Sequence, residues 1–219
     1  IRLTYNEVVT LEFLGGYDAN GNRNAENNVT VFTGNKEHQI FNFASEMQCK
    51  FDGINFVNGY AEKGGAIVAS LGSYSFTGCN FSENESVAGG GAILFSAGGS
   101  AIFENCEFNN NESTPLSPDF DDKALGGTIY CNSKTTDLVL TFKGCVASDN
   151  TAYRGGFICS YGAKINIINS TLTGNESRRG GGVFYLSSAA DLTVENCVFT
   201  ENKALYGATI NADSQVVVN

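Results

Sequence analysis

Three observations on this sequence predict an all-β fold in which the chain winds as a parallel β-helix. A nine-residue motif, apolar-x-[Asn/Gly]-[Cys/Ser/Ile]-x-apolar-x-x-[Asn/Gly], recurs along the chain, and a Gly-Gly-Ala-Ile-like motif follows each copy. Between the motifs, apolar and polar residues alternate with a period of two, which indicates strands with one buried face. The nine-residue motif occupies residues 51–59, 76–84, 103–111, 142–150, 167–175 and 194–202.

The two motifs together set the length of one coil at 25 to 27 residues. Leucine-rich repeats need an LxxLxL signature and helical repeats need a period of 3.6, and the sequence shows neither. We therefore expect about six regular coils, each with three short strands around the Gly-Gly motif, the inward Phe and the Cys-x-Phe segment. One coil is longer because residues 113–123, which contain both prolines, form a loop insertion.

Equivalent positions of successive coils stack in a parallel β-helix, so each motif position predicts a column of like side chains. Asparagine should form an internal ladder, because a stacked side-chain amide bonds to the next amide and to the turn backbone. Cysteine should form an adjacent core column, because a thiol packs as a small hydrophobe. The predicted ladder is Asn84, Asn111, Asn150, Asn175 and Asn202, and the predicted cysteine column is Cys79, Cys106, Cys145 and Cys197.

The chain has seven cysteines, so at least one cannot pair within it. Disulfides between coils are the alternative to core packing, but parallel Cβ vectors keep the two carbons too far apart for them. Cys131 and Cys159 follow their Gly-Gly motifs at different offsets, so we expect them on opposite faces of their strands and unbridged. The cysteines do not predict a metal site either, since there is no CxxC motif and the single His38 is distant.

The N-terminal residues 1–46 lack the Gly-Gly motif but contain strand-like segments. We expect them to form one or two irregular coils, or a cap, of the same domain as the repeats in 47–219. The rule for parallel crossovers predicts a right-handed winding. The sequence stops where a further strand should follow, so we expect it to be a segment of a longer chain or to dock onto a partner there.

The net charge of −10 argues against a nucleic-acid partner, which would require clusters of Lys and Arg. No apolar run approaches the ~18 residues of a membrane span, so we expect no membrane insertion by this segment. We also expect no cofactor. Asp119, Asp121 and Asp122 in the insertion are weak candidates for a Ca²⁺ site, since they lack the spacing and the glycine of a calcium loop.

The strand that follows each Gly-Gly motif is apolar on both of its alternating faces, although only one face can point into the core. A sheet that is apolar on both faces is usually covered on both. We therefore expect a lateral packing surface that includes Tyr130, Phe157 and Tyr185, covered by the insertion or by another chain. Among the N-x-[Ser/Thr] sequons, Asn28 and Asn80 are the candidates for glycosylation because the ladder asparagines should be buried.

Carbohydrate-active enzymes are the alternative function class for a β-helix. A hydrolase needs two carboxylates that converge on one bond, and a lyase needs a cation site and a basic residue. The outward positions of the predicted strands place no two acids next to each other. Arg154, Arg178 and Arg179 are the candidates for a lyase base, but no acidic cluster accompanies them, so we expect a non-catalytic protein.

The repeats resemble those of polymorphic membrane proteins, in which GGAI is paired with FxxN, as in Phe81–Asn84 and Gly90–Ile93 here. The variant NCxFxxN at 105–111 and 196–202 is similar to repeats of other large microbial surface proteins. The resemblance spans about residues 47–211. It implies a right-handed β-helix that acts as an extracellular or cell-surface adhesin or passenger scaffold. As partners we expect other protein chains or further domains of the same chain, and host or matrix glycans. The alternative is a pectin-lyase-like polysaccharide lyase or hydrolase.

Overall fold

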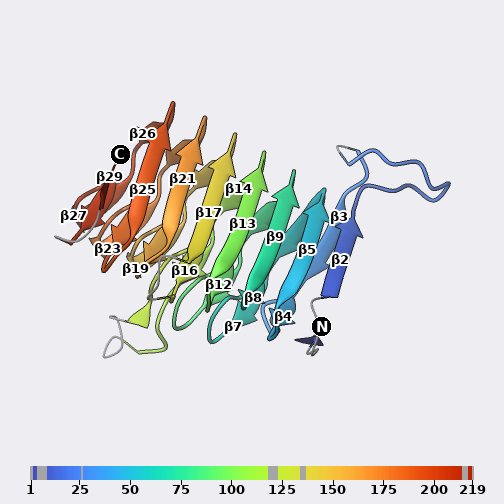
Figure 1. Cartoon of the computed structure of the whole chain (residues 1–219), viewed down its shortest axis with the longest axis horizontal. Coiled ribbons are helices and arrows are strands. Elements are labelled where there is room, and N and C mark those ends of the chain that lie inside the picture. Colours follow the sequence, from blue (N-terminus) through green and yellow to red (C-terminus); the bar gives the residue numbers. More distant parts are fainter. Residues whose placement is uncertain are drawn as a thin grey trace.

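The computed structural model describes residues 2–3, 9–25, 27–117, 123–133, 137–213 and 217–218. In this part of the chain the backbone winds as a parallel β-helix with four sheets, which we name I to IV in the order in which one coil visits them. Figure 1 shows the coils stacked along the longest axis of the molecule. Each sheet therefore contains one strand from each successive coil, paired in parallel with its neighbours.

Sheets I and II each have eight strands. Sheet I consists of β1 (Arg2–Leu3), β4 (Phe41–Phe43), β8 (Ile67–Ala69), β12 (Ile93–Phe95), β16 (Ile129–Cys131), β20 (Ile158–Ser160), β24 (Phe184–Leu186) and β28 (Ile210–Ala212). Sheet II consists of β2 (Val9–Leu14), β5 (Met47–Asp52), β9 (Gly72–Thr77), β13 (Gly99–Glu104), β17 (Leu138–Lys143), β21 (Lys164–Ile168), β25 (Asp191–Glu195) and β29 (Val217–Val218).

Sheets III and IV follow sheet II in each coil. Sheet III consists of β3 (Thr30–Thr33), β6 (Ile54–Val57), β10 (Asn80–Ser82), β14 (Glu107–Asn109), β18 (Val146–Ser148), β22 (Thr171–Thr173) and β26 (Val198–Thr200). Sheet IV consists of β7 (Tyr60–Ala61), β11 (Glu85–Ser86), β15 (Glu112–Ser113), β19 (Thr151–Arg154), β23 (Glu176–Gly180) and β27 (Lys203–Tyr206). The three predicted strands of a coil are those of sheets I to III, and sheet IV adds a fourth.

Two columns of phenylalanine fill the interior between sheets II and III. In the first column the ring centroids of Phe51 and Phe76 are 5.1 Å apart, and those of Phe76 and Phe103 are 4.8 Å apart. In the second column the rings of Phe56 and Phe81 are 4.6 Å apart. In-register parallel pairing places like residues about 4.8 Å apart, which allows each ring to stack on the next.

The second phenylalanine column is interrupted at Ala147, which pairs with Phe108 of the preceding coil. The space is filled by Phe157, whose ring centroid lies 5.3 Å from that of Phe108. Phe157 occupies a corner position at which the preceding coil has the smaller Thr128. In this coil the phenylalanine column therefore has a small residue, Ala147, and the corner position has a large one, Phe157. The ring of Phe157 fills the space that Ala147 leaves, so the interior stays packed.

The Gly-Gly motif forms a sharp corner between sheets IV and I. Gly90 has a φ angle of 66°, and a Cβ on Gly91 would lie 2.0 Å from a carbonyl oxygen of the next coil, so both positions require glycine. After the corner, Ala92 and Ile93 both point inward and are fully buried. The N–H groups of both donate to the carbonyl oxygen of Thr128, which shows that the strand alternation begins only at Ile93.

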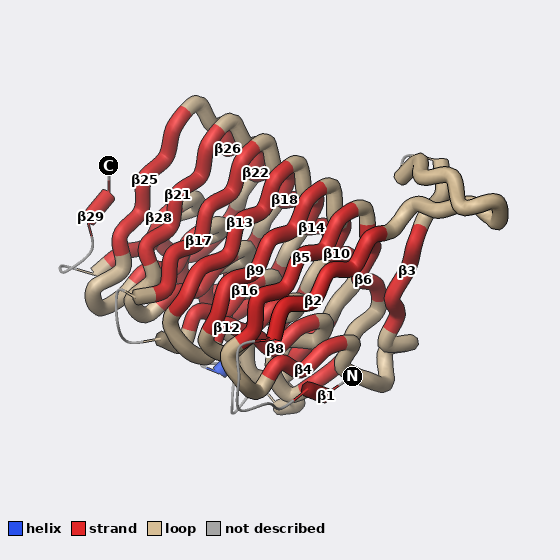
Figure 2. The backbone as a smooth tube through the Cα atoms, turned by 45° about the vertical axis from the view of Figure 1, so that its right-hand side comes forward, coloured by secondary structure: helices blue, strands red, loops and turns tan. Residues whose placement is uncertain are grey.

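Residues 9–43 form a further coil of the same solenoid. β2 pairs in register with β5, and the ring of Phe13 stacks on that of Phe51 with a centroid distance of 4.8 Å. β3 pairs with β6 and β4 pairs with β8. The loop 15–29 projects from the corner between β2 and β3, where Figure 2 shows it extending away from the coils. The solenoid thus includes most of the segment that lacks the repeat motifs.

Candidate functional site

An open groove of about 350 Å³ lies on sheet II across its first four strands, β2, β5, β9 and β13. We name it the sheet II groove. Residues two apart in a strand share a face, so each strand contributes a pair of outward side chains. The groove is lined by Thr10, Leu11, Glu12, Gln48, Cys49, Lys50, Ser73, Tyr74, Ser75, Ser100 and Ile102.

The sheet II groove carries hydroxyl and amide groups together with one ion pair. Nζ of Lys50 donates to Oε1 of Glu12 at 2.7 Å, and both side chains are half exposed. This hydrogen bond raises the pKa of Lys50 above its ordinary value. Oγ1 of Thr10 donates to Oε1 of Gln48 at 3.4 Å. The charges that line the groove therefore compensate each other, and the remaining polar groups are neutral.

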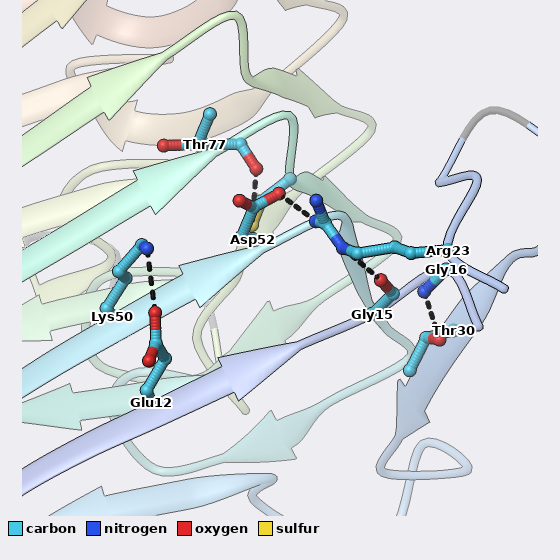
Figure 3. Close-up of polar contacts among 9 residues, drawn as sticks. Glu12, Gly15, Gly16, Arg23, Thr30, Lys50, Asp52 and Thr77 are labelled. Atoms are coloured by element: carbon cyan, nitrogen blue, oxygen red, sulfur yellow. Dashed lines mark hydrogen bonds and ion pairs between the residues drawn. The ribbon is translucent and has the colours of Figure 1, made fainter. Parts of the chain in front are cut away.

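The projecting loop is fixed to the sheet beside this groove by Arg23, as Figure 3 shows. Nε of Arg23 donates to the carbonyl oxygen of Gly15 at 3.0 Å, and Nη2 forms an ion pair with the carboxylate of Asp52. The N–H of Gly16 donates to Oγ1 of Thr30 at 3.0 Å. These contacts hold the start of the loop against β3 and its middle against the end of β5.

The chemistry of the sheet II groove suits hydrogen bonding to a polyhydroxylated ligand. Hydroxyl and amide side chains both donate and accept hydrogen bonds, as sugar hydroxyls require. A glycosidase needs two carboxyl groups on either side of the bond, whereas the carboxylate of Glu12 is held by Lys50. A lysine that acts as a base needs a lowered pKa, and that of Lys50 is shifted in the opposite direction.

The asparagine ladder runs through the buried corner between sheets III and IV. The backbone N–H and Nδ2 of Asn84 both donate to Oδ1 of Asn111, at 3.1 and 3.0 Å. Asn111 donates in the same way to Asn150, which donates to Asn175. Each Nδ2 also donates to a backbone carbonyl of the coil before it, such as that of Phe81 for Asn111. The ladder satisfies buried polar groups and is structural.

The cysteine column lies between the two phenylalanine columns. The thiol of Cys106 donates to the carbonyl oxygens of Phe76 and Glu104, at 3.4 and 3.5 Å. In the same column, Oγ of Ser170 donates to the carbonyl oxygen of Ile168 at 2.8 Å. Hydrogen bonds with the neighbouring thiols of the column, reinforced by burial, raise the pKa of Cys106. All seven cysteines lie in the described part of the chain and are free thiols.

The lateral packing surface predicted on sheet I is covered by the chain itself over its middle coils. Leu125, which follows the insertion, packs with Leu94, Tyr130 and Cys159 on the outer face, and the exposed fraction of Tyr130 is 8%. Tyr185 packs against this cluster and is partly buried.

The prediction that Phe157 belongs to that surface is wrong, because Phe157 lies in the core at 1% exposure. Strict alternation would place Phe157 and Ile158 on opposite faces of the strand, whereas the corner makes both of them point inward. Cys131 lies in the core and Cys159 lies on the outer face, so the two point to opposite faces of their strands, as predicted.

The remaining predicted sites are placed as follows. Asn28 lies in the projecting loop, where its Nδ2 donates to the carbonyl oxygen of Gly16 at 3.2 Å. Asn80 points outward from β10 but is half buried, and its Oδ1 has no hydrogen-bond partner in the described part of the chain. The Ca²⁺ candidates Asp119, Asp121 and Asp122 lie outside the described residues.

Sequence reasoning missed two features of the outer surface. The ion pairs of Lys50 with Glu12 and of Arg23 with Asp52 depend on the coil before the first repeat motif, and that coil carries neither of the two motifs. The contact of Arg154 with tyrosine rings depends on neighbouring coils. Its guanidinium carbon lies 5.2 Å from the ring centroid of Tyr185. The sequence signal near this contact is one extra residue before the glycine corner, where ESRRG precedes Gly181 but TAYR precedes Gly155 and KALY precedes Gly207.

Comparison with known proteins identifies the family. A family model described as a right handed beta helix region matches residues 17–199. The match includes the N-terminal coil from residue 17 onward and the six copies of the nine-residue motif except residues 200–202 of the last copy. No curated protein and no solved structure matches the chain. Within the described residues, no helix is long and apolar enough to cross a membrane. With parallel sheets and a matching family model over most of its length, this chain belongs to the right-handed β-helix family.

Proposed function

We propose that this chain is a non-catalytic scaffold of an extracellular or cell-surface adhesin, and that its sheet II groove binds a neutral glycan. The observation that carries the proposal is the groove itself, where hydroxyl and amide groups from four successive coils surround an internally compensated ion pair. A stiff solenoid holds these groups at fixed spacing, which reduces the entropy cost of binding an extended polymer.

Two further observations support the surface role. The GGAI and FxxN repeats resemble those of polymorphic membrane proteins, which are surface-exposed, and Asn28 and Asn80 offer sequons on outward positions. Six of the seven cysteines are buried and Cys197 is partly buried, and burial raises the pKa of Cys131 to about 12. A buried thiol with a raised pKa is protected from oxidation outside the cell.

The proposal is tested by binding neutral oligosaccharides to the wild-type chain and to groove variants, first on an array and then by calorimetry. We expect Gln48→Ala and Ser75→Ala each to weaken binding about fivefold, the effect of losing one hydrogen bond. Thr141→Ala is the matched control because Thr141 points outward from the same sheet beyond the groove. Absence of binding, or an equal loss in the control, would reject the glycan proposal.

The enzyme alternative is tested on the same samples by measuring unsaturated uronate products and new reducing ends after incubation with polysaccharides. We expect neither to accumulate. Cleavage by the wild-type chain that disappears in Glu12→Gln would replace the scaffold by a lyase or hydrolase acting in the same groove.

A further inference from the structure

Sheet IV contains a β-bulge that places two arginines side by side. Ser177 and Gly180 of β23 pair with Ala152 and Arg154 of β19, and the register shifts between these two pairs. β23 therefore has two residues, Arg178 and Arg179, where β19 has one. Bulges redirect side chains and are frequent at functional sites, so this local break in an otherwise regular solenoid directs attention to its surroundings.

The residues around the bulge form a cluster that we name the arginine–tyrosine cluster. The guanidinium carbon of Arg154 lies 5.5 Å from the ring centroid of Tyr153 and 5.2 Å from that of Tyr185. Nη1 of Arg179 donates to the hydroxyl of Tyr153 at 3.3 Å. Tyr206 pairs with Gly180, directly after Arg179, and is 56% exposed. The cluster consists of Tyr153, Arg154, Arg179, Tyr185, Leu205 and Tyr206.

The cluster has binding capacity that the fold does not use. Nε of Arg154 is buried and has no hydrogen-bond partner among the described residues, although an unpaired buried donor costs free energy. Leu205, in the adjacent strand β27, leaves 69% of its surface exposed. Stacking on tyrosine rings orients a guanidinium and reduces the entropy that it loses when it binds a carboxylate.

The charge of the cluster contrasts with that of the whole chain. The chain has 23 acidic residues and 13 basic ones, yet the cluster combines two arginines with no carboxylate among its members. Glu176, in the same strand as Arg179, and Glu112 line an adjoining cavity of about 250 Å³, to which Arg178 and the cluster residue Tyr153 also contribute. The cluster is therefore a cationic and aromatic patch on an anionic molecule, and it is complementary to a negatively charged ligand.

We propose that the arginine–tyrosine cluster docks an acidic segment of a partner protein that also carries apolar side chains. Tyrosine and arginine dominate the binding energy of protein–protein interfaces. Leu205 and Tyr206 supply apolar area that a sugar chain could not match, and the cluster lacks the serine, threonine and glutamine side chains of the sheet II groove. The inference goes beyond the proposed function, because it concerns a protein partner and a surface other than the sheet II groove.

The test uses fluorescein-labelled peptides in which Glu alternates with Leu, with Lys-for-Glu peptides and an acidic oligosaccharide as comparison probes. Fluorescence anisotropy at two salt concentrations measures the affinity of the whole chain. We expect the acidic peptide to bind more weakly at high salt, and Arg179→Gln and Tyr206→Ala each to lower its affinity about tenfold. Lys164→Gln and Tyr17→Ala are matched controls, because both positions are exposed and outside the cluster.

Three results would overturn the proposal: no binding of the acidic peptide, equal losses in the cluster variants and in the controls, or binding of the acidic oligosaccharide alone. Unfolding midpoints equal to the wild type confirm that each variant is folded. Gln48→Ala in the sheet II groove should leave peptide binding unchanged. A failure of glycan binding and a failure of peptide binding are therefore separate outcomes.

Discussion

Inside the solenoid the side chain at a given position changes little between coils, whereas on the outer face it changes at almost every step. The inward column of sheet II runs through Phe51, Phe76 and Phe103, while the outward column one residue earlier runs through Lys50, Ser75 and Ile102. Both columns lie on the same strands with the same register. The difference therefore comes from the surroundings of the side chain and not from the backbone.

This contrast separates the inward side chains, which stabilise the fold, from the outward side chains, which can vary and bind ligands. An inward side chain must fit the equivalent side chains above and below it, so a column repeats one solution. An outward side chain meets water and is constrained mainly by its ligand. Irregular outward columns, such as those of the sheet II groove and the arginine–tyrosine cluster, are therefore the places where binding is expected.

The largest expected effect on stability comes from comparing substitutions at two adjacent residues of β13, one inward and one outward. Phe103→Ala removes a fully buried ring from the stacked column and should lower the free energy of unfolding by about 3–5 kcal/mol. Ile102→Ala, at a side chain that is 41% exposed, should change it by no more than about 0.5 kcal/mol. Urea unfolding followed by circular dichroism measures both. Equal effects would show that the two columns are not energetically distinct.

The next largest loss of stability is expected for a substitution in the asparagine ladder. Asn111→Ala removes the oxygen that accepts from both the N–H and Nδ2 of Asn84. Each unpaired buried donor costs about 1–3 kcal/mol, so we expect a loss of about 2–4 kcal/mol in urea unfolding. Asn55→Ala, on the outward face of sheet III, is the control and should be nearly neutral. A neutral Asn111→Ala would mean that water enters the ladder.

The exchange of Ala147 and Phe157 tests whether the interior requires a certain residue or only a filled space. Phe157→Ala should destabilise by about 3–5 kcal/mol and Ala147→Phe by about 1–3 kcal/mol through overpacking. In the double variant the new ring should occupy the vacated space, and the total loss should be smaller than the sum by about 0.5–3 kcal/mol. A double-mutant cycle in urea measures this coupling. Strict additivity would contradict the exchange of columns.

The smallest loss of stability is expected when a cysteine of the column is replaced by serine, because its thiol already donates a hydrogen bond as a hydroxyl would. Cys106→Ser keeps a donor to the same carbonyl oxygens, as Ser170 does in its own coil, and should cost less than about 1 kcal/mol. Cys159→Ser places a hydroxyl among Leu94, Leu125 and Tyr130 and should cost about 1–3 kcal/mol. Thermal unfolding of both variants provides the measurement, and the reverse order would contradict this interpretation of the column.

Much of the interior could be predicted from the sequence because its rules are local and repeated. A ladder asparagine is recognised by its place in a nine-residue motif, and parallel pairing then stacks Asn84 on Asn111 without further information. The sheet IV strands are harder to predict, because β7, β11 and β15 have only two residues each and a bulge in β23 breaks the alternation of a longer strand.

The outer surface was less predictable, since its contacts join residues with no shared motif. Lys50 meets Glu12 only because β2 pairs in register with β5, and β2 lies outside the repeats. Phe157 was assigned to the wrong face because the corner after the Gly-Gly motif delays the alternation, and no local pattern reports that delay. Arg154 contacts Tyr185 from the following coil, a proximity set by the winding of the whole chain.

The asparagine ladder also has a direction, and this bears on how the protein is made. The two donors of Asn84 find their acceptor in Asn111, which lies 27 residues later and leaves the ribosome after it. At a usual rate of translation the acceptor arrives about 1–5 seconds later. Until then the newest coil holds two donors without their partner. The ladder of each coil is therefore completed only after its successor has been synthesised.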